Sequence, residues 1–351
     1  MLGALHFSHL LVLVLLPLLA ACTPPSEHQV LELHGETMGT FYNIQVVDPP
    51  PAVELNTLQD KIDAELDLVD ASMSTYREDS ELSRFNRSRT KDWLAVSPQL
   101  AWLVKEALWS SEMSGGAFDV TVGPLVNLWG FGPGSETDDL PTDAQIAQAQ
   151  ALVGYRKLQV REHPPGLRKS EPALYLDLSA IAKGYAVDRV AQLLDRVGVA
   201  NYLVEIGGEL RGRGHNGRGL PWRIAIERPD PGKREVYKIL ELRDLAMATS
   251  GDYRNFFERN KKRYSHIIDP ATGRPVTHGL ASVTVLASQT ARADALATAF
   301  LVLGPETGLA LAESLKTPAL FLVRTPTGFT ELRTSAWDSY LPSEPDAERK
   351  K

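Results

Sequence analysis

The spacing of hydrophobic residues changes midway through residues 174–188, and this change limits the secondary structure that the stretch can form. Three leucines alternate with polar residues over 174–178, which is the period of a half-buried strand. After Ser179 the apolar residues recur at helical spacing, and Gly198 provides a stop. We therefore expect a strand, a short turn and a helix to meet near residues 180–184.

Such a junction suits an anionic ligand. The first turn of a helix leaves unpaired N–H groups at the positive end of its dipole, and these groups bind phosphate. Lys183 would add a cation there, and Asp177 would offer a carboxylate to a metal ion or a nucleotide hydroxyl. The alternative is an ordinary strand–helix packing unit whose Lys and Asp face solvent, because a lone glycine-and-lysine motif is a weak signal.

Composition places this stretch in a globular body. The chain has 351 residues, of which 43% are hydrophobic and 23% charged, and its net charge of −7 gives no indication of nucleic-acid binding. Strand-like and helical periods follow one another without strict alternation, and no linker or repeat stands out between residues 30 and 340. We expect an α+β fold: a single domain over 30–340, with mixed β-sheets flanked by helices, in one or two lobes.

Hydrophobic spacing and capping residues predict where the elements lie. Ser97 is a good helix N-cap, and further helices are predicted to begin at Ser80 and at Thr142. Further helices are predicted over 55–69 and 291–303, and from Pro305 onward. Strands are predicted over 30–47 with an interruption at 35–39, and over 202–206, 224–226, 236–242, 283–286, 319–323 and 329–332.

The N-terminal segment differs from the rest of the chain. Residues 10–21 are almost wholly apolar, are too short to span a membrane, and precede Cys22, the only cysteine. Small residues before a cysteine resemble a bacterial lipobox, so we expect a lipoprotein signal peptide over 1–21 and a tether over 22–29 acylated at Cys22. The alternative is a buried apolar segment with an incidental cysteine. Residues 341–351 are predicted to be a charged tail.

A second informative stretch is the alanine-rich helix that contains Asp294 and Thr298. These two residues are four apart, so their oxygen atoms lie on one face, where small neighbours let another element approach. A carboxylate and a hydroxyl are hard oxygen ligands, which suit Mg²⁺ better than Zn²⁺. The alternative is a buried helix whose Asp294 pairs with Arg292 or caps locally.

Other polar segments have both a functional and a structural interpretation. His266 could be a general base near neutral pH with Asp269 orienting its loop, or a histidine satisfied within a strand. Residues 249–254 could bind phosphate or form a capped turn, and Gly207-Gly208 could let backbone approach a ligand. Dinucleotide, Walker, zinc-protease and α/β-hydrolase signatures are absent from the sequence.

Taken in order, these segments resemble the ApbE family, whose members are FAD:protein FMN transferases. The most distinctive block is Asp-Leu-Ser-Ala-Ile-Ala-Lys-Gly at 177–184, and the likeness covers about residues 30 to 335. The blocks that carry the resemblance are 36–40, 73–76, 116–119, 177–184, 206–209, 249–254, 265–275 and 293–298. One departure is Asn260-Lys-Lys-Arg263, which stands where a glycine-bearing turn is common.

The resemblance implies that Mg²⁺ assists cleavage of the pyrophosphate of FAD. FMN would pass to a Thr or Ser hydroxyl of an acceptor flavoprotein, with release of AMP. It also implies that His266 is the base, and that Ala180 (through its carbonyl), Asp294 and Thr298 ligate the metal. The residues that would contact FAD are Met38, Tyr76, Ala117, Phe118, Asp119, Asp177 and Lys183.

The resemblance also indicates partners and a location. Known acceptors are subunits of Rnf-type and sodium-translocating quinone reductase complexes, and a lipid anchor on Cys22 would hold the protein at a membrane facing the periplasm. The inner membrane is favoured over the outer one. Two alternatives remain open: an Mg²⁺-dependent FAD pyrophosphatase that uses water as acceptor, and a non-enzymatic FAD-binding lipoprotein.

Overall fold

The computed structural model describes residues 28–134, 139–232 and 234–340. The predicted signal peptide, Cys22 and the charged tail over 341–351 lie outside the described residues.

The helices are α1 (Leu55–Met73), α2 (Glu81–Arg87), α3 (Pro98–Met113), α4 (Gly123–Leu128), α5 (Asp143–Gln150), α6 (Ser179–Arg196) and α7 (Thr290–Ser314), with short 3-10 turns η1 (Tyr155–Lys157) and η2 (Ser335–Tyr340). The strands are β1 (Val30–Thr37), β2 (Thr40–Val47), β3 (Leu94–Ala95), β4 (Leu158–Glu162), β5 (Pro165–Lys169), β6 (Asn201–Ile206), β7 (Glu209–Arg213), β8 (Trp222–Glu227), β9 (Val236–Leu242), β10 (Leu245–Gly251), β11 (Phe256–Arg259), β12 (Lys262–Ser265), β13 (Ile268–Asp269), β14 (Arg274–Pro275), β15 (Leu280–Ala287), β16 (Ala319–Thr325) and β17 (Gly328–Arg333).

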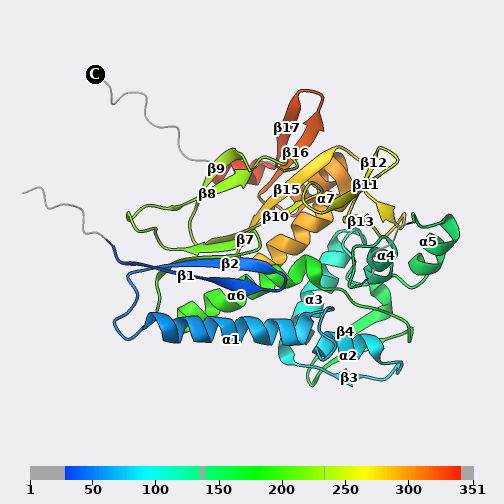
Figure 1. Ribbon diagram of the computed structural model, residues 1–351, viewed down its shortest axis with the longest axis horizontal. Coiled ribbons are helices and arrows are strands. Elements are labelled where there is room, and N and C mark those ends of the chain that lie inside the picture. The colour runs from blue at the N-terminus through cyan, green and yellow to red at the C-terminus, as the bar shows by residue number, and fades with distance from the viewer. Residues whose placement is uncertain (1–27, 135–138, 233, 341–351) are drawn as a thin grey trace, which may run out of the picture.

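One eight-stranded sheet organises the molecule, in the order β1-β2-β6-β7-β10-β15-β16-β17. It joins distant segments: Tyr42 of β2 lies opposite Ile206 of β6, and Thr249 of β10 lies opposite Thr284 of β15. Helices α6 and α7 pack together against one face, with α1 outside α6 (Figure 1). The predicted α+β class is confirmed. The strand pairs among the described residues are all antiparallel, so the sheets are not mixed in strand direction.

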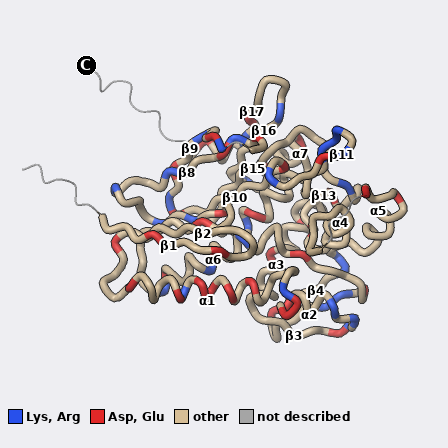
Figure 2. Tube along the Cα trace, viewed as in Figure 1, with Lys and Arg blue, Asp and Glu red and all other residues tan. Residues whose placement is uncertain are grey.

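The opposite face of this sheet is covered by the β8–β9 hairpin. A separate apolar cluster forms there, in which Trp222 and Leu242 of the hairpin pack with Met247, Leu286 and Trp337. The helical side has the larger core and a charged exterior, and Figure 2 shows acidic residues (red) spaced along α1. The central strand β15 is therefore buried along nearly its whole length, whereas the edge strands β1 and β17 remain partly exposed.

The helix starts predicted at Ser80, Ser97 and Thr142 are confirmed, and each of these residues caps its helix. The hydroxyl of Ser80 accepts the N–H of Ser83 at 2.9 Å, and the hydroxyl of Ser97 accepts the N–H of Leu100 at 3.1 Å. Thr142 forms a reciprocal capping box with the side chain of its third helical residue. Each cap satisfies an N–H that the first turn cannot pair internally, which is why local sequence alone locates these helix starts.

The strand predicted over 174–178 does not form. Its burial alternates as expected, with the three leucines buried and the residues between them partly exposed. No strand among the described residues lies beside it, however, and its backbone pairs irregularly instead. Leu176 bonds through both its N–H and its carbonyl to the side chain of Asn86, and the N–H of Asp177 donates to the Val120 carbonyl at 2.8 Å. The segment is extended backbone that leads directly into α6.

Helices α6 and α7 approach each other unusually closely. A Cβ at Gly184 would lie 2.5 Å from the Thr290 carbonyl oxygen, so only glycine permits this contact. Gln289, before α7, makes no side-chain cap. The cap comes instead from Asp188 of α6, whose carboxylate accepts the N–H groups of Thr290 and Ala291 at 2.9 and 3.0 Å. Helix α6 thus completes the first turn of α7.

Helix α7 breaks where the sequence predicts two helices. Gly304 has φ 81° and ψ 179°, outside the helical region, and Pro305 starts the second half. The whole helix is long and apolar enough to cross a membrane, but most of its residues are buried against α6 and the sheet. It is therefore a core helix, and its first half carries Asp294 and Thr298.

Candidate functional site

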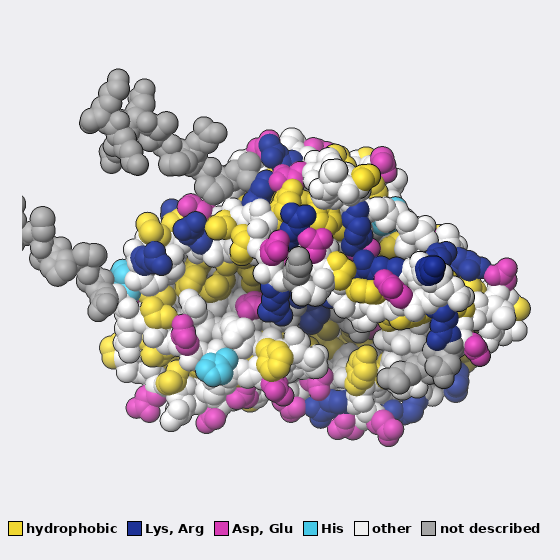
Figure 3. Space-filling model, turned by 45° about the horizontal axis from the view of Figure 1, so that its top comes forward, with side chains coloured by type: hydrophobic (Ala, Val, Ile, Leu, Met, Phe, Trp, Pro, Cys, Tyr) yellow, Lys and Arg dark blue, Asp and Glu magenta, His cyan; other side chains and the backbone are white. Residues whose placement is uncertain are grey.

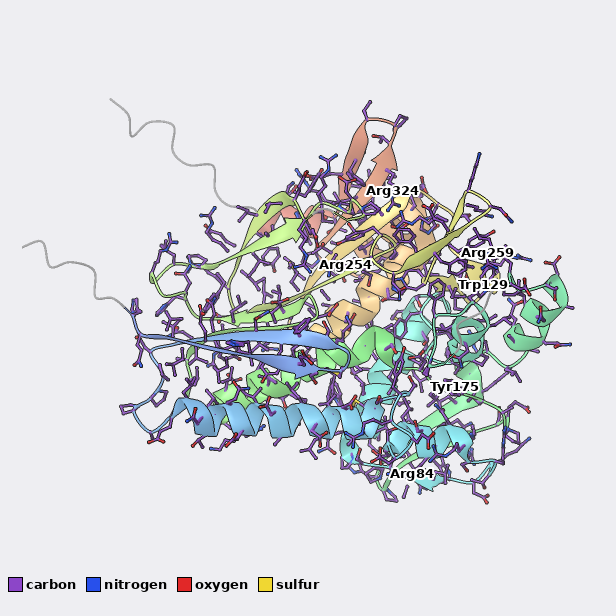
Figure 4. The ribbon with its side chains drawn as sticks, in the orientation of Figure 1. Arg84, Trp129, Tyr175, Arg254, Arg259 and Arg324 are labelled. Atoms are coloured by element: carbon purple, nitrogen blue, oxygen red, sulfur yellow. The ribbon has the colours of Figure 1, made fainter. Side chains whose placement is uncertain are left out.

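A cavity of about 680 Å³ lies between the start of α6, the first half of α7, and the chain around β8, β10 and β12. Figure 3 shows basic (dark blue) and acidic (magenta) side chains close together near the centre of one face. Arg254, from the wall after β10, lies near the centre of the molecule in Figure 4. Nearly all the predicted site residues line this cavity: Tyr76, Ala117, Phe118, Asp119, Asp177, Ala180, Lys183, His266, Asp294 and Thr298.

Met38 is the predicted site residue that does not line the cavity. It lies at the turn between β1 and β2 with φ 48°, and it packs on the apolar core. The adjoining Thr40 approaches Gly207, a cavity residue, because a Cβ at Gly207 would lie 3.0 Å from the Thr40 methyl. The hairpin tip therefore supports the cavity wall from behind.

Three charged side chains meet where α6 and α7 border the cavity. The Lys183 Nζ lies 2.5 Å from Oε2 of Glu209, and the Asp294 Oδ2 accepts the N–H of Gly184 at 3.1 Å. Glu209 and Asp294 are each only 3% exposed. Burial raises the pKa of the Asp294 carboxyl, as does Glu209, whereas Lys183 and the Gly184 N–H oppose the rise. The cluster holds two carboxylates against one ammonium, a charge distribution that a cation would complete.

The pKa of the Lys183 ammonium reflects the same excess of carboxylates over cations. Burial disfavours its charge, but the carboxylates of Glu209 and Asp294 outweigh burial and raise the pKa of the Lys183 ammonium. Lys183 therefore stays protonated across the physiological range. An ammonium held beside a cavity in this way can neutralise phosphate oxygens.

The oxygen atoms around Asp294 fit a hard cation. The hydroxyl of Thr298 lies one turn further along α7 and is 3.0 Å from the Ser250 hydroxyl. An α-helical N–H normally bonds the carbonyl four residues earlier, which for Gly184 is that of Ala180. The Gly184 N–H also donates to Asp294, which brings the Asp294 carboxylate to the same turn of α6 as Ala180, and Ala180 lines the cavity. Carboxylate, hydroxyl and carbonyl together are the donor types that Mg²⁺ accepts.

The structural alternative in which Asp294 pairs with Arg292 does not hold. Arg292 does not pair with Asp294, since its guanidinium contacts Glu106 at 2.6 Å. Within residues 28–134, 139–232 and 234–340, no three His, Cys, Asp or Glu side chains converge as a transition-metal site would require.

His266 lies at the other side of the cavity, at the end of β12. Its Nδ1 is 2.9 Å from the carbonyl oxygen of Asn255, which can only accept, so Nδ1 carries the proton and Nε2 is the basic nitrogen. Burial lowers the pKa of the His266 imidazole, and Lys183 adds to this effect, which keeps the ring neutral. The edge of its ring faces Phe131, with 6.3 Å between centroids. A neutral imidazole with one free nitrogen beside a cavity can act as a base.

Asp177 and Tyr76 form a more open part of the wall. Oδ1 of Asp177 accepts the N–H and the hydroxyl of Ser179 at 2.9 and 2.6 Å, which fixes the carboxylate at the entry to α6. Tyr76 lines the cavity although 69% of its surface is exposed. An exposed aromatic ring on a cavity wall is typical of a ligand-binding surface.

The segment of Ala117, Phe118 and Asp119 supplies wall rather than reactive groups. The Asp119 carboxylate is buried and accepts three hydrogen bonds, from the N–H and hydroxyl of Thr121 and from the N–H of Tyr155. Burial raises the pKa of the Asp119 carboxyl, and these bonds oppose that rise. Its side chain holds the loop together, so any contact with a ligand here is made by the surface of the segment.

Two important residues were missed by the reasoning from sequence. Glu209 was considered only as part of a glycine corner, yet it is the ion-pair partner of Lys183. Asp188, which caps α7, was not considered. One signal pointed to it: Gln289 is a poor cap, so the N-terminus of α7 needs an acceptor from elsewhere in the chain.

Comparison with known proteins gives consistent results. The family model described as "ApbE family" matches residues 38–321. The chain is 49% identical over 332 residues to the FAD:protein FMN transferase of Vibrio cholerae, covering 95% of this chain and 98% of the relative. It is 44% identical over 282 residues to the enzyme of the same name from Escherichia coli K12, covering 79% and 80%.

Solved structures agree with this result. The flavin transferase ApbE from Vibrio cholerae superposes with a TM-score of 0.83 at 48% identity, covering 90% of this chain and all of that one. The apo form of the Pseudomonas stutzeri flavinyl transferase ApbE superposes with a TM-score of 0.82 at 42% identity, covering 91% and 98%.

Proposed function

The chain belongs to the ApbE family of flavin transferases, and from that premise we propose that it transfers FMN from FAD to a Thr or Ser hydroxyl of an acceptor flavoprotein, with Mg²⁺ as cofactor and AMP as the other product. One observation supports this specific reaction most directly. Lys183, Asp294 and Thr298 on one side and His266 on the other all line a single cavity, which holds charge-neutralising groups and a base together.

The reaction needs one bond to form and one to break. The acceptor oxygen bonds to the phosphorus on the FMN side of the pyrophosphate. The bond between that phosphorus and the bridging oxygen breaks, and AMP leaves with the bridging oxygen. The hydroxyl proton passes to Nε2 of His266, the nitrogen that does not bond Asn255. Phosphoryl-type transfer depends mainly on alignment and charge neutralisation, so a protein nucleophile is unnecessary.

The α6–α7 side supplies the neutralisation. Lys183 would place its ammonium against the pyrophosphate oxygens while Glu209 holds it in position. Asp294, Thr298 and the Ala180 carbonyl would hold Mg²⁺, which when bound acts as a Lewis acid on those oxygens. Asp177 and Tyr76, on the open wall, would contact the rest of FAD, together with the segment 117–119.

The proposal includes a place and a set of partners. A lipid anchor on Cys22 would hold the enzyme at the cell envelope facing the periplasm, in the inner membrane more readily than the outer. Acceptors would be subunits of Rnf-type or sodium-translocating quinone reductase complexes. Support for the location comes from the N-terminal sequence alone, and support for the acceptor class comes from the resemblance.

The test is a flavin-transfer assay. The chain from residue 23 onward, which includes every described element, is mixed with FAD, Mg²⁺ and the soluble domain of an Rnf-type acceptor subunit. The expected result is a fluorescent acceptor band on a denaturing gel that disappears with EDTA. FMN and AMP free in solution, with no labelled acceptor, would instead indicate hydrolysis. Bound FAD without turnover would indicate a flavin carrier and contradict the proposal.

A further inference from the structure

The β11–β12 hairpin extends from the cavity wall at the position of the base. Its two ends are joined by His266, whose N–H donates to the Asn255 carbonyl at 3.1 Å, and both residues line the cavity. Each strand has four residues, so the tip lies about 14 Å beyond the cavity wall. Figure 1 shows the hairpin (yellow) at the upper right, far from the start of β1 at the left.

Aromatic stacking fixes this hairpin in position. Phe257 stacks on Tyr264 across the hairpin, with ring centroids 5.2 Å apart, and on Phe131 at 5.4 Å. Tyr264 in turn stacks on Trp129 at 5.6 Å, and Phe131 also meets the ring of His266. The tip therefore has a defined place relative to the base, as a rigid rim rather than a loose loop.

The tip carries a dense positive charge. The hairpin has four basic residues and one acidic residue, in a chain whose net charge is −7. Three of the basic residues, Arg259, Lys261 and Lys262, form what we call the cationic tip. Lys261 and Lys262 are exposed, and Arg259 is partly exposed. No ion pair joins any of the three to a carboxylate among the described residues. Figure 4 labels Arg259 at this end of the molecule.

Two features of the cationic tip are unfavourable for the hairpin itself. Arg259 and Lys262 are direct cross-strand partners, and like charges in that position repel each other. The turn between them has Asn260 at φ 51° and Lys261 at φ 60°. A two-residue turn of this kind favours Asn followed by Gly, because a side chain at the second position is strained. The hairpin would be more stable with glycine at 261, so its lysine requires another explanation.

We propose that the cationic tip docks an acidic surface on the acceptor flavoprotein, next to the Thr or Ser that receives FMN. This inference rests on the proposed transferase function and specifies the partner. The acceptor hydroxyl must reach His266, and a protein bound there covers the rim from which the tip extends. Lys262 lies over the Tyr264 ring at 5.4 Å, but none of the three cations has a carboxylate partner in the part of the chain that the structure describes. Cations without a carboxylate partner on a fixed rim steer an oppositely charged protein toward the site. Under the proposed function FAD would occupy the cavity, and the tip lies beyond the cavity wall.

The experiment compares charge variants of the full chain in the transfer assay, with the same Rnf-type acceptor domain. The triple variant Arg259→Glu, Lys261→Glu, Lys262→Glu should lower kcat/KM for the acceptor by about tenfold at low ionic strength. The difference should shrink as salt screens the charges, and KM for FAD should not change. Lys261→Gly, which removes one charge and relieves the turn, should lower kcat/KM by about threefold.

Two matched controls separate charge from conformation. Asn260→Gly relieves the same turn and keeps every charge, so acceptor kinetics should stay at the wild-type value. Lys316 is another exposed lysine with positive φ, 52°, at the far end of α7. Lys316→Gly therefore makes the same chemical change away from the rim and should leave kcat/KM unaltered.

Four results would overturn the inference. Unchanged acceptor kinetics in the triple variant would show that the tip docks nothing, while the transferase function would stand. A rise in KM for FAD alone would assign the tip to FAD. Loss of binding to vesicles of anionic phospholipid, with normal acceptor kinetics, would assign it to the membrane. If the wild-type chain labels no acceptor at all, the proposed function fails first and the docking inference falls with it.

Discussion

The two sides of the cavity differ in how they hold their charged residues: one side buries them and the other exposes them. The side formed by α6 and α7 buries Glu209 and Asp294 among small residues, and each charge there has a partner within reach. The β11–β12 hairpin on the other side exposes cations that have no carboxylate partner among the described residues, on a strained turn. A buried side must be positioned to within fractions of an ångström, whereas an exposed rim acts at a distance through its charge.

This difference teaches where substitutions should matter. Changes on the α6–α7 side leave buried charges unpaired or force backbones apart, so they should affect chemistry and folding strongly. Changes on the hairpin alter solvated charge, so they should affect encounter with a partner and little else. If substitutions on the two sides have similar effects on activity and stability, this contrast between buried and exposed charge is wrong.

The largest expected effect comes from Asp294→Ala. Transfer should fall at least about a thousandfold, because the carboxylate proposed to hold Mg²⁺ is lost. The fold should remain, in contrast to backbone changes on this side, because the variant removes a buried carboxylate and the Gly184 N–H keeps its ordinary helical acceptor, the Ala180 carbonyl. Initial transfer rates and cooperative thermal unfolding measure the two parts. Full activity would remove Asp294 from the metal site.

Next comes Gly184→Ala. The added Cβ would lie 2.5 Å from backbone oxygen and 2.9 Å from the Cα of Ala291, so the helices must move apart. The free energy of unfolding should fall by about 3 kcal/mol. Gly115→Ala is the matched control, because φ is 63° there but nothing lies within 4 Å. That control should lose about 1 kcal/mol, from backbone conformation alone. Equal losses in urea unfolding would show that close packing is not the cause.

A smaller effect concerns pH. Because burial lowers the pKa of the His266 imidazole, the active neutral form persists below the ordinary histidine value of about 6.5. The acid limb of the transfer rate should therefore lie below pH 6.5, and His266→Gln should abolish the limb along with most of the activity. The same shift contributes stability that is fully present above about pH 6.5 and is lost as the pH falls. A limb above pH 7 would contradict the role of His266.

The smallest effect is on the rim. Lys261→Gly should raise the free energy of unfolding by about 0.5 kcal/mol, since glycine adopts positive φ without strain and one repelling charge is removed. Thermal unfolding measures this gain. A loss of stability would mean that Lys261 serves the hairpin itself, and the contrast between the two sides would weaken.

The parts of the fold that local sequence determines were predictable. Ser80, Ser97 and Thr142 start helices because their hydroxyls satisfy the N–H groups that follow them, and Gly304 interrupts α7 where two helices were expected. Asp294 and Thr298 share a face because helical spacing places them there. In each case the structural feature depends only on residues within a few positions of it in the sequence.

What depends on distant segments was not predictable from pattern alone. The alternating leucines over 174–178 indicate burial correctly, but they do not show whether a partner strand exists, and the side chain of Asn86 pairs with that backbone instead. The ion pair of Lys183 with Glu209 likewise depends on how α6 meets β7. Antiparallel pairing of β2 with β6 joins residues more than a hundred positions apart, and no local period encodes it.

The cap that Asp188 provides across the helix boundary has a consequence for the order of folding. The N–H groups of Thr290 and Ala291 have their acceptor only when α6 is already docked, so α7 cannot complete its first turn alone. The helix that carries Asp294 and the helix that carries Lys183 should therefore open and close as one cooperative unit. Lys183 and Asp294, which these two helices carry, should therefore be in place together or absent together.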